Sequence, residues 1–533
     1  MTRQTPFNNE PLLDFSEEKN RHSIHNGLQE LESLIARSAI YARPIINGEE
    51  LRGAETLSRM DPSDQSATIG VVEFGDIKVA ERAVAACAEG LRSWRTTSAE
   101  HRATTLNRMA ALMRERKSLL TALLIREVGK TWREADADVA EAIDFCDYYA
   151  AEMRRLAPPR LTEQVMGEEN YYLYQPRGVT VVIAPWNFPL AIACGMSVAA
   201  LVTGNTVLLK PAEQSSLIGY QLARIILEAG VPKEAFAFLP AKGEDVGPYL
   251  TGHPEVAMIV FTGSRPVGLS IVESASKVPA GQRMIKKVVA ELGGKNAIIV
   301  DEDADFDDAI RGVLSSAFGF AGQKCSACSR LIVVGDAYEP FIERLAAATQ
   351  DLIVGNASDP SSFLGPVVDG EAYERITSTI RSASEQLTLL AQAKVPTELS
   401  QRGNFIPPTI FRDVPSTHAI WTDEIFGPVV ACARARDFDH ALEMATSSEY
   451  ALTGGVYSRH PQNLQKAKEE FRVGNLYINR GITGALVGRQ PFGGFLMSGI
   501  GSKAGGPDYL VQFMEPRVVT ENTMRRGFSP DVA

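Results

Sequence analysis

The sequence predicts an α/β protein built around a doubly wound parallel sheet. From residue 178 onward, short apolar strands alternate with helical segments, and repeated strand–helix–strand units generate parallel sheets. The stretch 178–209 contains no charged residue, as expected for strands buried on both faces. A second alternating region begins near residue 295, which predicts a second α/β domain.

Composition narrows the class of protein. A chain of 533 residues with 45% hydrophobic residues is long enough for two to four domains. The net charge of −11 argues against nucleic-acid binding, which normally needs a basic surface. Six scattered cysteines and an N-terminus without an apolar signal run predict a cytoplasmic protein. Pro185, Pro189 and a Thr-Gly-Asn turn at 203–205 interrupt the uncharged stretch, so we expect no membrane span.

The elements follow in order along the chain. The first 45 residues form a polar, helical extension, and "PIINGEEL" with "DPSDQSATIG" predicts hairpins. Apolar residues at helical spacing predict helices over 78–94, 99–126 and 133–155.

The alternating region then predicts strands at 179–184 and 206–209 and within "AFAFLP", "VAMIVFTGS", "NAIIVDEDAD" and "SRLIVVG". It predicts helices at 190–202, 215–229 and 243–252, a helix that begins near 266, and one within "FDDAIRGVLSSAFGF". Gly230 is a stop signal for the helix before it. We expect the polar end, 500–533, to project and pair with a partner subunit.

The segment "GFAGQKCSACSR" raises three possibilities for Cys325 and Cys328: a redox dithiol, half of a zinc site, or one nucleophile with a neighbouring sulfur. A redox pair normally begins a helix, whereas this pair follows a helix and precedes a strand. The seven histidines are scattered and supply no metal-ligand spacing, so we predict no metal site. A single nucleophilic cysteine remains, and the sequence assigns it no histidine base.

Other stretches keep two interpretations when read alone. "GIGSKAGG" formally matches a dinucleotide fingerprint but lacks the strand–helix context, so we interpret it as a turn. Gly263 and Ser264 stand between a strand and a helix, which suits a pyrophosphate or simply a tight turn. Lys210 and Glu213 either bind a ribose or are charged residues of a solvated loop. Glu291 is either a catalytic carboxylate or a carboxylate that simply ends a strand.

Seven motifs together resemble the series found in the aldehyde dehydrogenase superfamily. They are "PWNFP", "KPAE", "FTGS", "ELGGKN", "GQKCSACSR", "EIFGPV" and "PFGGF", in that order over nearly the whole chain. The resemblance implies the fold of that superfamily, with a Rossmann-type NAD-binding domain, an α/β catalytic domain and an oligomerisation arm made of a β-hairpin and the C-terminal tail.

A narrower resemblance is to the Δ1-pyrroline-5-carboxylate dehydrogenases, carried by "FGFAGQKCSACSR", "NRGITGALVGRQPFGGF", "SKAGGPDYL", "FNNEPLLDFS" and "ADVAEAIDFCDYYA". It implies NAD-dependent oxidation of L-glutamate γ-semialdehyde to glutamate in proline catabolism. Because it begins near residue 7, we expect the free-standing enzyme rather than a form fused to a proline dehydrogenase domain.

The resemblance implies a role for individual residues. Cys325 would be the nucleophile, Asn187 an oxyanion donor and Glu291 the general base, while Cys328 is a bystander. The implied cofactor contacts are Ile183, Pro185, Trp186, Lys210, Glu213, Gly263, Ser264, Leu292, Glu424 and Phe426. The implied substrate contacts are Glu141, Phe188, Ser326, Gly484, Ala485 and Phe492.

The resemblance also implies a domain plan. Residues 1–158 and 178–291 would form the NAD-binding domain, 292–490 the catalytic domain, and 159–177 with 491–533 an arm exchanged in a homodimer or larger homo-oligomer.

Two alternatives remain at this point. Another acidic semialdehyde, such as a succinylated one, could be the substrate, although "GITGALVGRQPF" favours glutamate semialdehyde. A binding or structural protein with this fold should have lost its catalytic residues, and the retention of Cys325, Glu291 and Asn187 argues against it.

Overall fold

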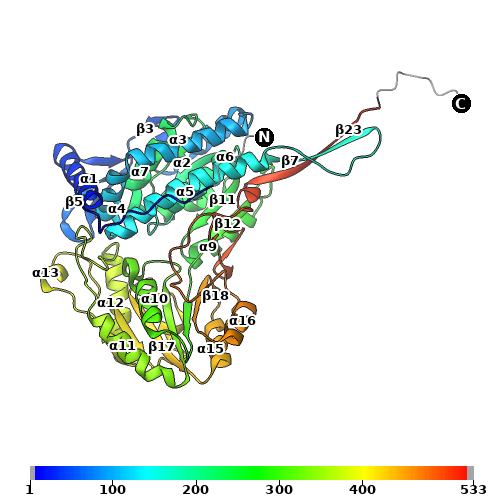
Figure 1. Cartoon of the computed structure of the whole chain (residues 1–533). Helices are drawn as coiled ribbons and strands as arrows, with labels where there is room; N and C mark the ends of the chain where they lie inside the picture. Colours follow the sequence, from blue (N-terminus) through cyan, green and yellow to red (C-terminus); the bar gives the residue numbers. More distant parts are fainter. Residues whose placement is uncertain (1–6, 525–533) are drawn as a thin grey trace, which may run out of the picture.

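The apolar runs from residue 179 onward form strands, and a computed structural model describes them within residues 7–524. They build two α/β bodies, from which a long arm projects (Figure 1). The first sheet contains, in spatial order, β22 (Gly499–Ile500), β12 (Lys287–Glu291), β11 (Val256–Thr262), β8 (Val179–Ile183), β9 (Thr206–Lys210), β10 (Phe236–Phe238), β2 (Ile45–Ile46) and β3 (Glu49–Glu50).

The first sheet is doubly wound. From β8 the chain adds β9 and β10 on one side, then returns to add β11 and β12 on the other, all parallel. The strand order therefore reverses between β8 and β11, and an open α/β sheet binds ligands beyond its carboxyl ends at that point. One face packs on α2 (Ile77–Trp94), α8 (Gly243–Gly252) and α9 (Arg265–Ser276). The other packs on α3 (Ala99–Glu115), α5 (Trp132–Leu156), α6 (Ala191–Val202) and α7 (Ser216–Glu228).

The second sheet is parallel apart from its edge strand β15. Its order is β15 (Thr388–Gln392), β16 (Thr409–Arg412), β17 (Val429–Ala435), β14 (Cys328–Val334), β13 (Asn296–Val300), β19 (Thr453–Tyr457) and β20 (Asn475–Ile478). Helices α10 (Phe306–Phe318) and α11 (Tyr338–Gln350) cover one face. Helices α12 (Gly370–Ser384), α15 (Phe438–Thr446) and α16 (Pro461–Glu470) bury apolar residues against the other.

Smaller elements complete the two bodies. They are α1 (Glu18–Arg37), α4 (Lys117–Val128), α13 (Thr397–Ser400), α14 (Ala419–Thr422), β1 (Ile40–Ala42), β4 (Glu55–Asp61), β5 (Asp64–Phe74), β18 (Tyr450–Ala451) and β21 (Phe495–Leu496). Strands β4 and β5 form one of the hairpins that the sequence predicts, and β2 with β3 forms the other.

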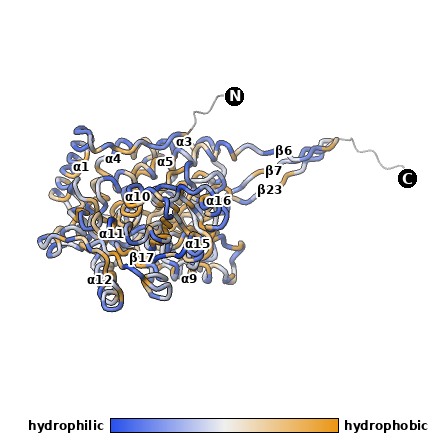
Figure 2. The backbone as a smooth tube through the Cα atoms, turned by 60° about the horizontal axis from the view of Figure 1, so that its bottom comes forward, coloured by the Kyte–Doolittle hydropathy of each residue, from blue (hydrophilic) through white to orange (hydrophobic). Residues whose placement is uncertain are grey.

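The arm is a three-stranded ribbon. Strand β7 (Glu168–Pro176) lies between β6 (Arg160–Leu161) and β23 (Met514–Asn522), and all three leave the body together (Figure 2). The C-terminal strand thus pairs with the hairpin of its own chain, over a register running from Met514↔Pro176 to Asn522↔Glu168. The last nine residues of the predicted arm, 525–533, lie outside the described residues.

Two boundaries differ from the sequence-based expectation. The predicted helix over 99–126 is two helices, α3 and α4, because Arg116 leaves the helical conformation at φ −104° and ψ 12°. Residues 491–513 were predicted as part of the arm, yet they stay with the body. There β21 pairs with β18, and β22 pairs with Glu291 and its neighbour on β12. Among the described helices, none combines the length and apolar character needed to cross a bilayer.

Candidate active site

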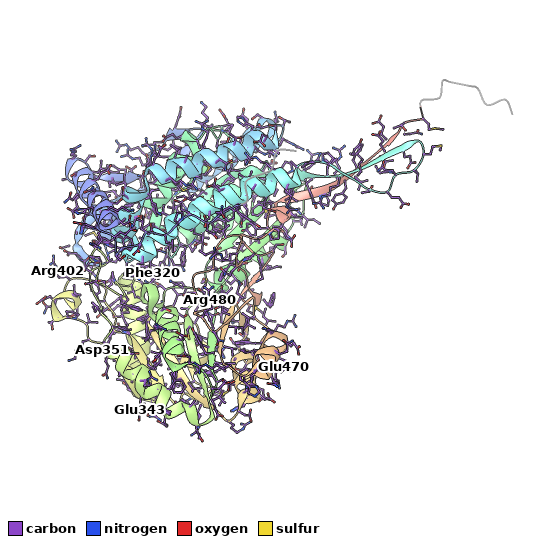
Figure 3. The ribbon with its side chains drawn as sticks, viewed as in Figure 1. Phe320, Glu343, Asp351, Arg402, Glu470 and Arg480 are labelled. Carbon is purple, nitrogen blue, oxygen red and sulfur yellow. The ribbon has the colours of Figure 1, made fainter. Side chains whose placement is uncertain are left out.

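The predicted catalytic residues gather between the two sheets. Asn187 follows the carboxyl end of β8, and Glu291 is the last residue of β12. Residues 292–295 then lead directly into β13, and Cys325 precedes the amino end of β14. The carboxyl edge of the first sheet therefore meets the amino edge of the second. Figure 3 labels Phe320 and Arg480 near this junction.

A network of backbone and side-chain hydrogen bonds holds the Cys325 segment. Asn296 donates from Nδ2 to the carbonyl oxygens of Cys325, at 2.7 Å, and Ala327, at 2.9 Å. The Cys325 carbonyl also packs so closely on Gly294 that a β-carbon there would overlap it. Burial raises the pKa of the Cys325 thiol to about 12, and the nearby carboxyl groups of Glu424 and Glu291 raise it too. The resting residue is therefore a neutral thiol.

Asn187 is aimed at the same segment. Its Nδ2 donates to the carbonyl of Gln323 at 3.0 Å, two residues before Cys325, and its side chain is buried. The amide that the resemblance assigns to an oxyanion thus lies beside the nucleophile.

Glu291 lies in a close-fitting pocket lined by two glycines. A β-carbon at Gly493 would come within 2.9 Å of Oε1, and one at Gly499 within 3.3 Å of Oε2. Oε2 is buried and has no hydrogen-bond partner among the described residues. Burial raises the pKa of Glu291 to about 8, against the opposing effects of the Gly494 N–H and the charge of Lys503. A carboxyl group that titrates near neutral pH is suited to act as a general base.

The first sheet offers a nucleotide-sized set of groups at its carboxyl edge. Gly263 follows β11, and Ser264 is the residue that precedes α9, where the backbone N–H groups of Arg265 and Val267 in the first turn suit an anion. Gly263 has no space for a β-carbon, because the Phe261 ring would lie 2.6 Å from it. Leu292 packs on Gly268 in the first turn of α9, so the helix lies close to the "ELGG" turn.

Lys210 and Glu213 form an ion pair beyond the end of β9. Lys210 Nζ lies 2.8 Å from Glu213 Oε1, and the same oxygen accepts the backbone N–H of Gly243 at 2.8 Å. The pairing keeps the pKa of Glu213 below its usual range despite burial. Glu213 is therefore ionised and fixed, as a ribose-binding carboxylate must be.

Glu424 and two aromatic rings close the remaining side. Glu424 accepts the backbone N–H of Gly294 at 2.9 Å and fills the space beside Gly293, where a β-carbon would overlap its carboxylate. The Trp186 ring contacts Phe426 edge-on, with centroids 5.5 Å apart. Phe426 has a positive φ of 54°, a conformation that costs energy for a bulky residue and therefore marks a constrained site. Ile183 and Pro185 end β8 and begin the loop to Trp186.

The predicted substrate contacts occupy the second side of the junction. Phe188 lies under the ammonium of Lys130, with Nζ 3.8 Å from the ring centroid. Glu141, on α5, has a pKa raised to about 8 by burial and by the charge of Asp138. Ser326 is buried, and its carbonyl accepts the Thr453 hydroxyl at 3.2 Å. Gly484 has a φ of 75° and open space where a β-carbon would be.

Ala485 and Phe492 are half-buried, and Phe492 forms a bridge with Ala504. No contact between Phe188 and Phe492 is among those described, so their paired role in holding substrate stays a prediction.

Sequence reasoning missed the residues that position the nucleophile. Gln323 is buried within the predicted "GQKC" motif and accepts the Val368 N–H at 2.9 Å. Asn296 ends the predicted "ELGGKN" motif, yet only the fold shows that its side chain spans Cys325 and Thr453. Lys130 was also missed: it is fully buried and lies 3.2 Å from Asp138. Gln323 and Asn296 both lie inside the predicted motifs, and this place in the chain was the available signal for them.

The described residues contain no cluster of three or more metal-ligating side chains. Cys325 and Cys328 are both free, and the Cys328 side chain points into the core of the second body.

Comparison with known proteins identifies the family. The model of the aldehyde dehydrogenase family matches residues 50–519. The chain belongs to the aldehyde dehydrogenase family. The family and the fold expected from the seven motifs are thereby confirmed.

Relatives of this family member cover almost the whole chain. It is 47% identical over 97% of its length to the 1-pyrroline-5-carboxylate dehydrogenase of Geobacillus kaustophilus (strain HTA426), and covers 99% of that protein. A solved 1-pyrroline-5-carboxylate dehydrogenase from Thermus, with bound NAD, is 45% identical and superposes with a TM-score of 0.94 over 98% of this chain and 100% of the other. Proline utilization A from Bdellovibrio bacteriovorus is 49% identical with a TM-score of 0.95 over 98% of this chain, which spans 54% of that longer protein.

Proposed function

We propose that this aldehyde dehydrogenase oxidises L-glutamate γ-semialdehyde, the ring-opened form of Δ1-pyrroline-5-carboxylate, to L-glutamate with NAD, as a step of proline catabolism. The observation that carries the proposal is the meeting of Cys325, Glu291 and Asn187 between the two sheets. Relatives named 1-pyrroline-5-carboxylate dehydrogenase, 42–47% identical over 97% of the chain, support the choice of substrate.

The three residues divide the chemistry among them. Cys325 gives its thiol proton to solvent water and attacks the aldehyde carbon as the thiolate, which makes a tetrahedral thiohemiacetal. The Asn187 amide and the Cys325 backbone N–H donate to its oxyanion, and losing one such donor costs about 3–4 kcal/mol of barrier in enzymes generally. Loss of hydride leaves a thioester on Cys325. Glu291 then removes a proton from water, which attacks the thioester and releases glutamate and the thiol.

The residues at the first sheet's edge fit NAD. When bound, NAD⁺ accepts the hydride released from the tetrahedral carbon. The α9 N-terminus with Gly263 and Ser264 would hold the pyrophosphate, because backbone amides and the helix dipole there favour an anion. Lys210 and the ionised Glu213 would hold the adenosine ribose, and a fixed carboxylate there repels a 2′-phosphate. Glu424 and Phe426 would position the nicotinamide ribose and ring.

The substrate's amino-acid end has its own proposed contacts. Ser326 and the backbone amides of Gly484 and Ala485 would hold the α-carboxylate, since a residue without a side chain lets the backbone approach closely. Glu141 would face the α-ammonium, and Phe188 and Phe492 would enclose the aliphatic chain.

Steady-state NADH formation tests this assignment. With NAD, we expect kcat/KM for Δ1-pyrroline-5-carboxylate to exceed that for pentanal and succinate semialdehyde by at least about tenfold, because only the first substrate's ring-opened form fills both the carboxylate and the ammonium contacts. Absorbance of NADH is the measurement. A higher kcat/KM for another acidic semialdehyde would replace the proposed substrate without affecting the proposed chemistry.

We also propose the domain plan and the cytoplasmic location expected from the sequence, with the C-terminal part of the arm beginning at Met514, together with assembly through the arm. The outer edge of β23 is unpaired among the described residues. Two apolar side chains of the arm are exposed, Val518 on β23 at 62% and Leu161 on β6 at 63%. An exposed strand edge with apolar side chains is a site for pairing with another chain. A homodimer or larger homo-oligomer would bury these side chains.

Charge on the arm is expected to break this assembly. In sedimentation velocity, the native protein should migrate as two or more chains and the Val518→Asp variant as one, because an aspartate cannot be buried unpaired in an apolar contact. Ile77→Asp is the matched control, since Ile77 is 50% exposed on the body, far from the arm in sequence. A native monomer at micromolar concentration, or an unchanged Val518→Asp assembly, contradicts the arm's proposed role.

A further inference from the structure

The first described residues form a strap, here defined as residues 7–13, that runs along α5. Asp144 on α5 accepts the Asn9 side chain at 2.8 Å and the Glu10 backbone N–H at 2.6 Å. Asp136, two turns earlier, accepts the Leu13 N–H at 2.8 Å. Two buried carboxylates of one helix thus fix the strap from both ends.

The strap also reaches a second, distant segment, which we call the anchor loop, residues 484–488. Asn9 donates from the same Nδ2 to the Val487 carbonyl at 2.8 Å. Phe7 stacks edge-on against Tyr148, with centroids 5.2 Å apart, and its ring borders Gly488, where a β-carbon would lie 3.2 Å from it. The Asn9 amide and the Phe7 ring of the strap therefore touch the anchor loop.

The anchor loop is also held at its C-terminal end, where Val487 is 4% exposed in the hydrophobic core and the Leu486 carbonyl accepts the N–H groups of Arg489 and Gln490. The Gly488 N–H donates to the Gly505 carbonyl at 2.8 Å, and the Leu486 N–H donates to Gln490 at 3.1 Å. Gly484 and Gly488 both have positive φ, at 75° and 74°. Because glycine has many accessible backbone conformations, contacts with neighbouring residues are needed to hold the loop in this one. No described side chain lies within 4 Å of where a Gly484 β-carbon would be.

Asn9 joins the two parts of the protein proposed to meet the substrate's amino-acid end. Its one amide bonds to Asp144, one helical turn after Glu141 on α5, and to Val487, next but one to Ala485. Glu141 faces the α-ammonium and Gly484–Ala485 the α-carboxylate in the proposed function. Asn9 therefore links the helix that carries Glu141 to the loop that carries Gly484 and Ala485.

We propose that the strap positions the anchor loop for the α-carboxylate of the substrate, with Asn9 as the positioning residue, so that the N-terminus sets the preference for carboxylated amino aldehydes. This rests on the proposed function, because it needs Gly484 and Ala485 to hold the carboxylate. Asn9 touches neither the reacting carbon nor Cys325 in this arrangement, so its loss should weaken substrate binding more than chemistry.

The experiment compares two five-carbon aldehydes in the full-length protein. For Asn9→Ala we expect KM for glutamate semialdehyde to rise about tenfold, with kcat within about twofold, because the hydrogen bond to the loop at Val487 and the one that ties Asn9 to Asp144 are both lost. KM and kcat for pentanal, which has no carboxylate or amino group, should stay within about twofold. Glu10→Ala is the matched control: it removes the ion pair of Glu10 with Arg114 at 2.8 Å but leaves the anchor loop's contacts intact.

Equal changes for both aldehydes, or an unchanged KM for glutamate semialdehyde, overturn the proposal. Phe7→Ala, which removes the ring beside Gly488 and keeps Asn9, gives the same split on a second variant and decides the matter if Asn9→Ala does not fold. A native enzyme that oxidises pentanal but not glutamate semialdehyde contradicts the proposed function itself, so the two failures are distinct.

Discussion

Cys325→Ala is expected to lower kcat by on the order of 10⁴-fold or more, because without the sulfur no thiohemiacetal or thioester forms. NAD affinity should change by less than about threefold, since the proposed nucleotide contacts lie on the first sheet and on Glu424 and Phe426. NADH formation gives kcat, and quenching of protein fluorescence by NAD gives the affinity. Turnover at the native rate would exclude Cys325 as the nucleophile.

Cys328→Ala is the matched control for this experiment. Cys328 is three residues away, is 1% exposed and packs in the core of the second body. Its replacement should keep kcat within a few-fold and lower the free energy of unfolding by about 1 kcal/mol, as a small core truncation does. A collapse of activity with Cys328→Ala would instead restore the dithiol interpretation of this pair.

Strands and strand ends were the features most open to prediction from sequence. Apolar runs bounded by Gly, Pro and Asn placed β8, β9, β11 and β13 within a few residues, because burial on both faces demands uninterrupted apolar sequence. The same logic put Glu291 at a strand end, where the structure has it as the last residue of β12. The break at Arg116 was not predictable, since neither Gly nor Pro marks it and apolar residues continue on both sides.

Contacts across long stretches of chain had no sequence signal. Asn9 and Val487 lie 478 residues apart, and nothing in the periodicity of either segment indicates the other. The pairing of Lys130 with Asp138 could not be predicted from the sequence either. Charged residues in a segment of mixed polarity are normally expected to face solvent, whereas both side chains here are fully buried. The motif resemblance named the reacting groups, while the groups that hold them in place emerged only from the fold.

Glu291→Gln is expected to separate the two halves of the reaction. The first turnover should still release about one NADH per active site, because attack by Cys325 and hydride loss do not use the base in the proposed scheme. Steady-state turnover should then fall by about 10²–10⁴-fold, the usual contribution of a general base, since water attacks the thioester unaided. Rapid-mixing absorbance at the NADH band resolves burst from steady state, and a missing burst would place Glu291 earlier in the reaction.

The pH dependence of the steady state gives a second, independent reading of Glu291. Burial raises its pKa to about 8, so the carboxyl is protonated and inactive as a base below that pH and ionised above it. The native steady-state rate should therefore rise as pH increases through about 8, and Glu291→Gln should lose this rise. The positive charge of Lys503 lowers the pKa of Glu291. Lys503→Met should therefore raise this pKa and move the rise in rate to higher pH, without abolishing it. If neither substitution alters the pH profile, another group is responsible for the titration. A rise that is lost in Glu291→Gln and shifted in Lys503→Met ties the hydrolytic step to the Glu291 carboxylate, which is held between Gly493 and Gly499.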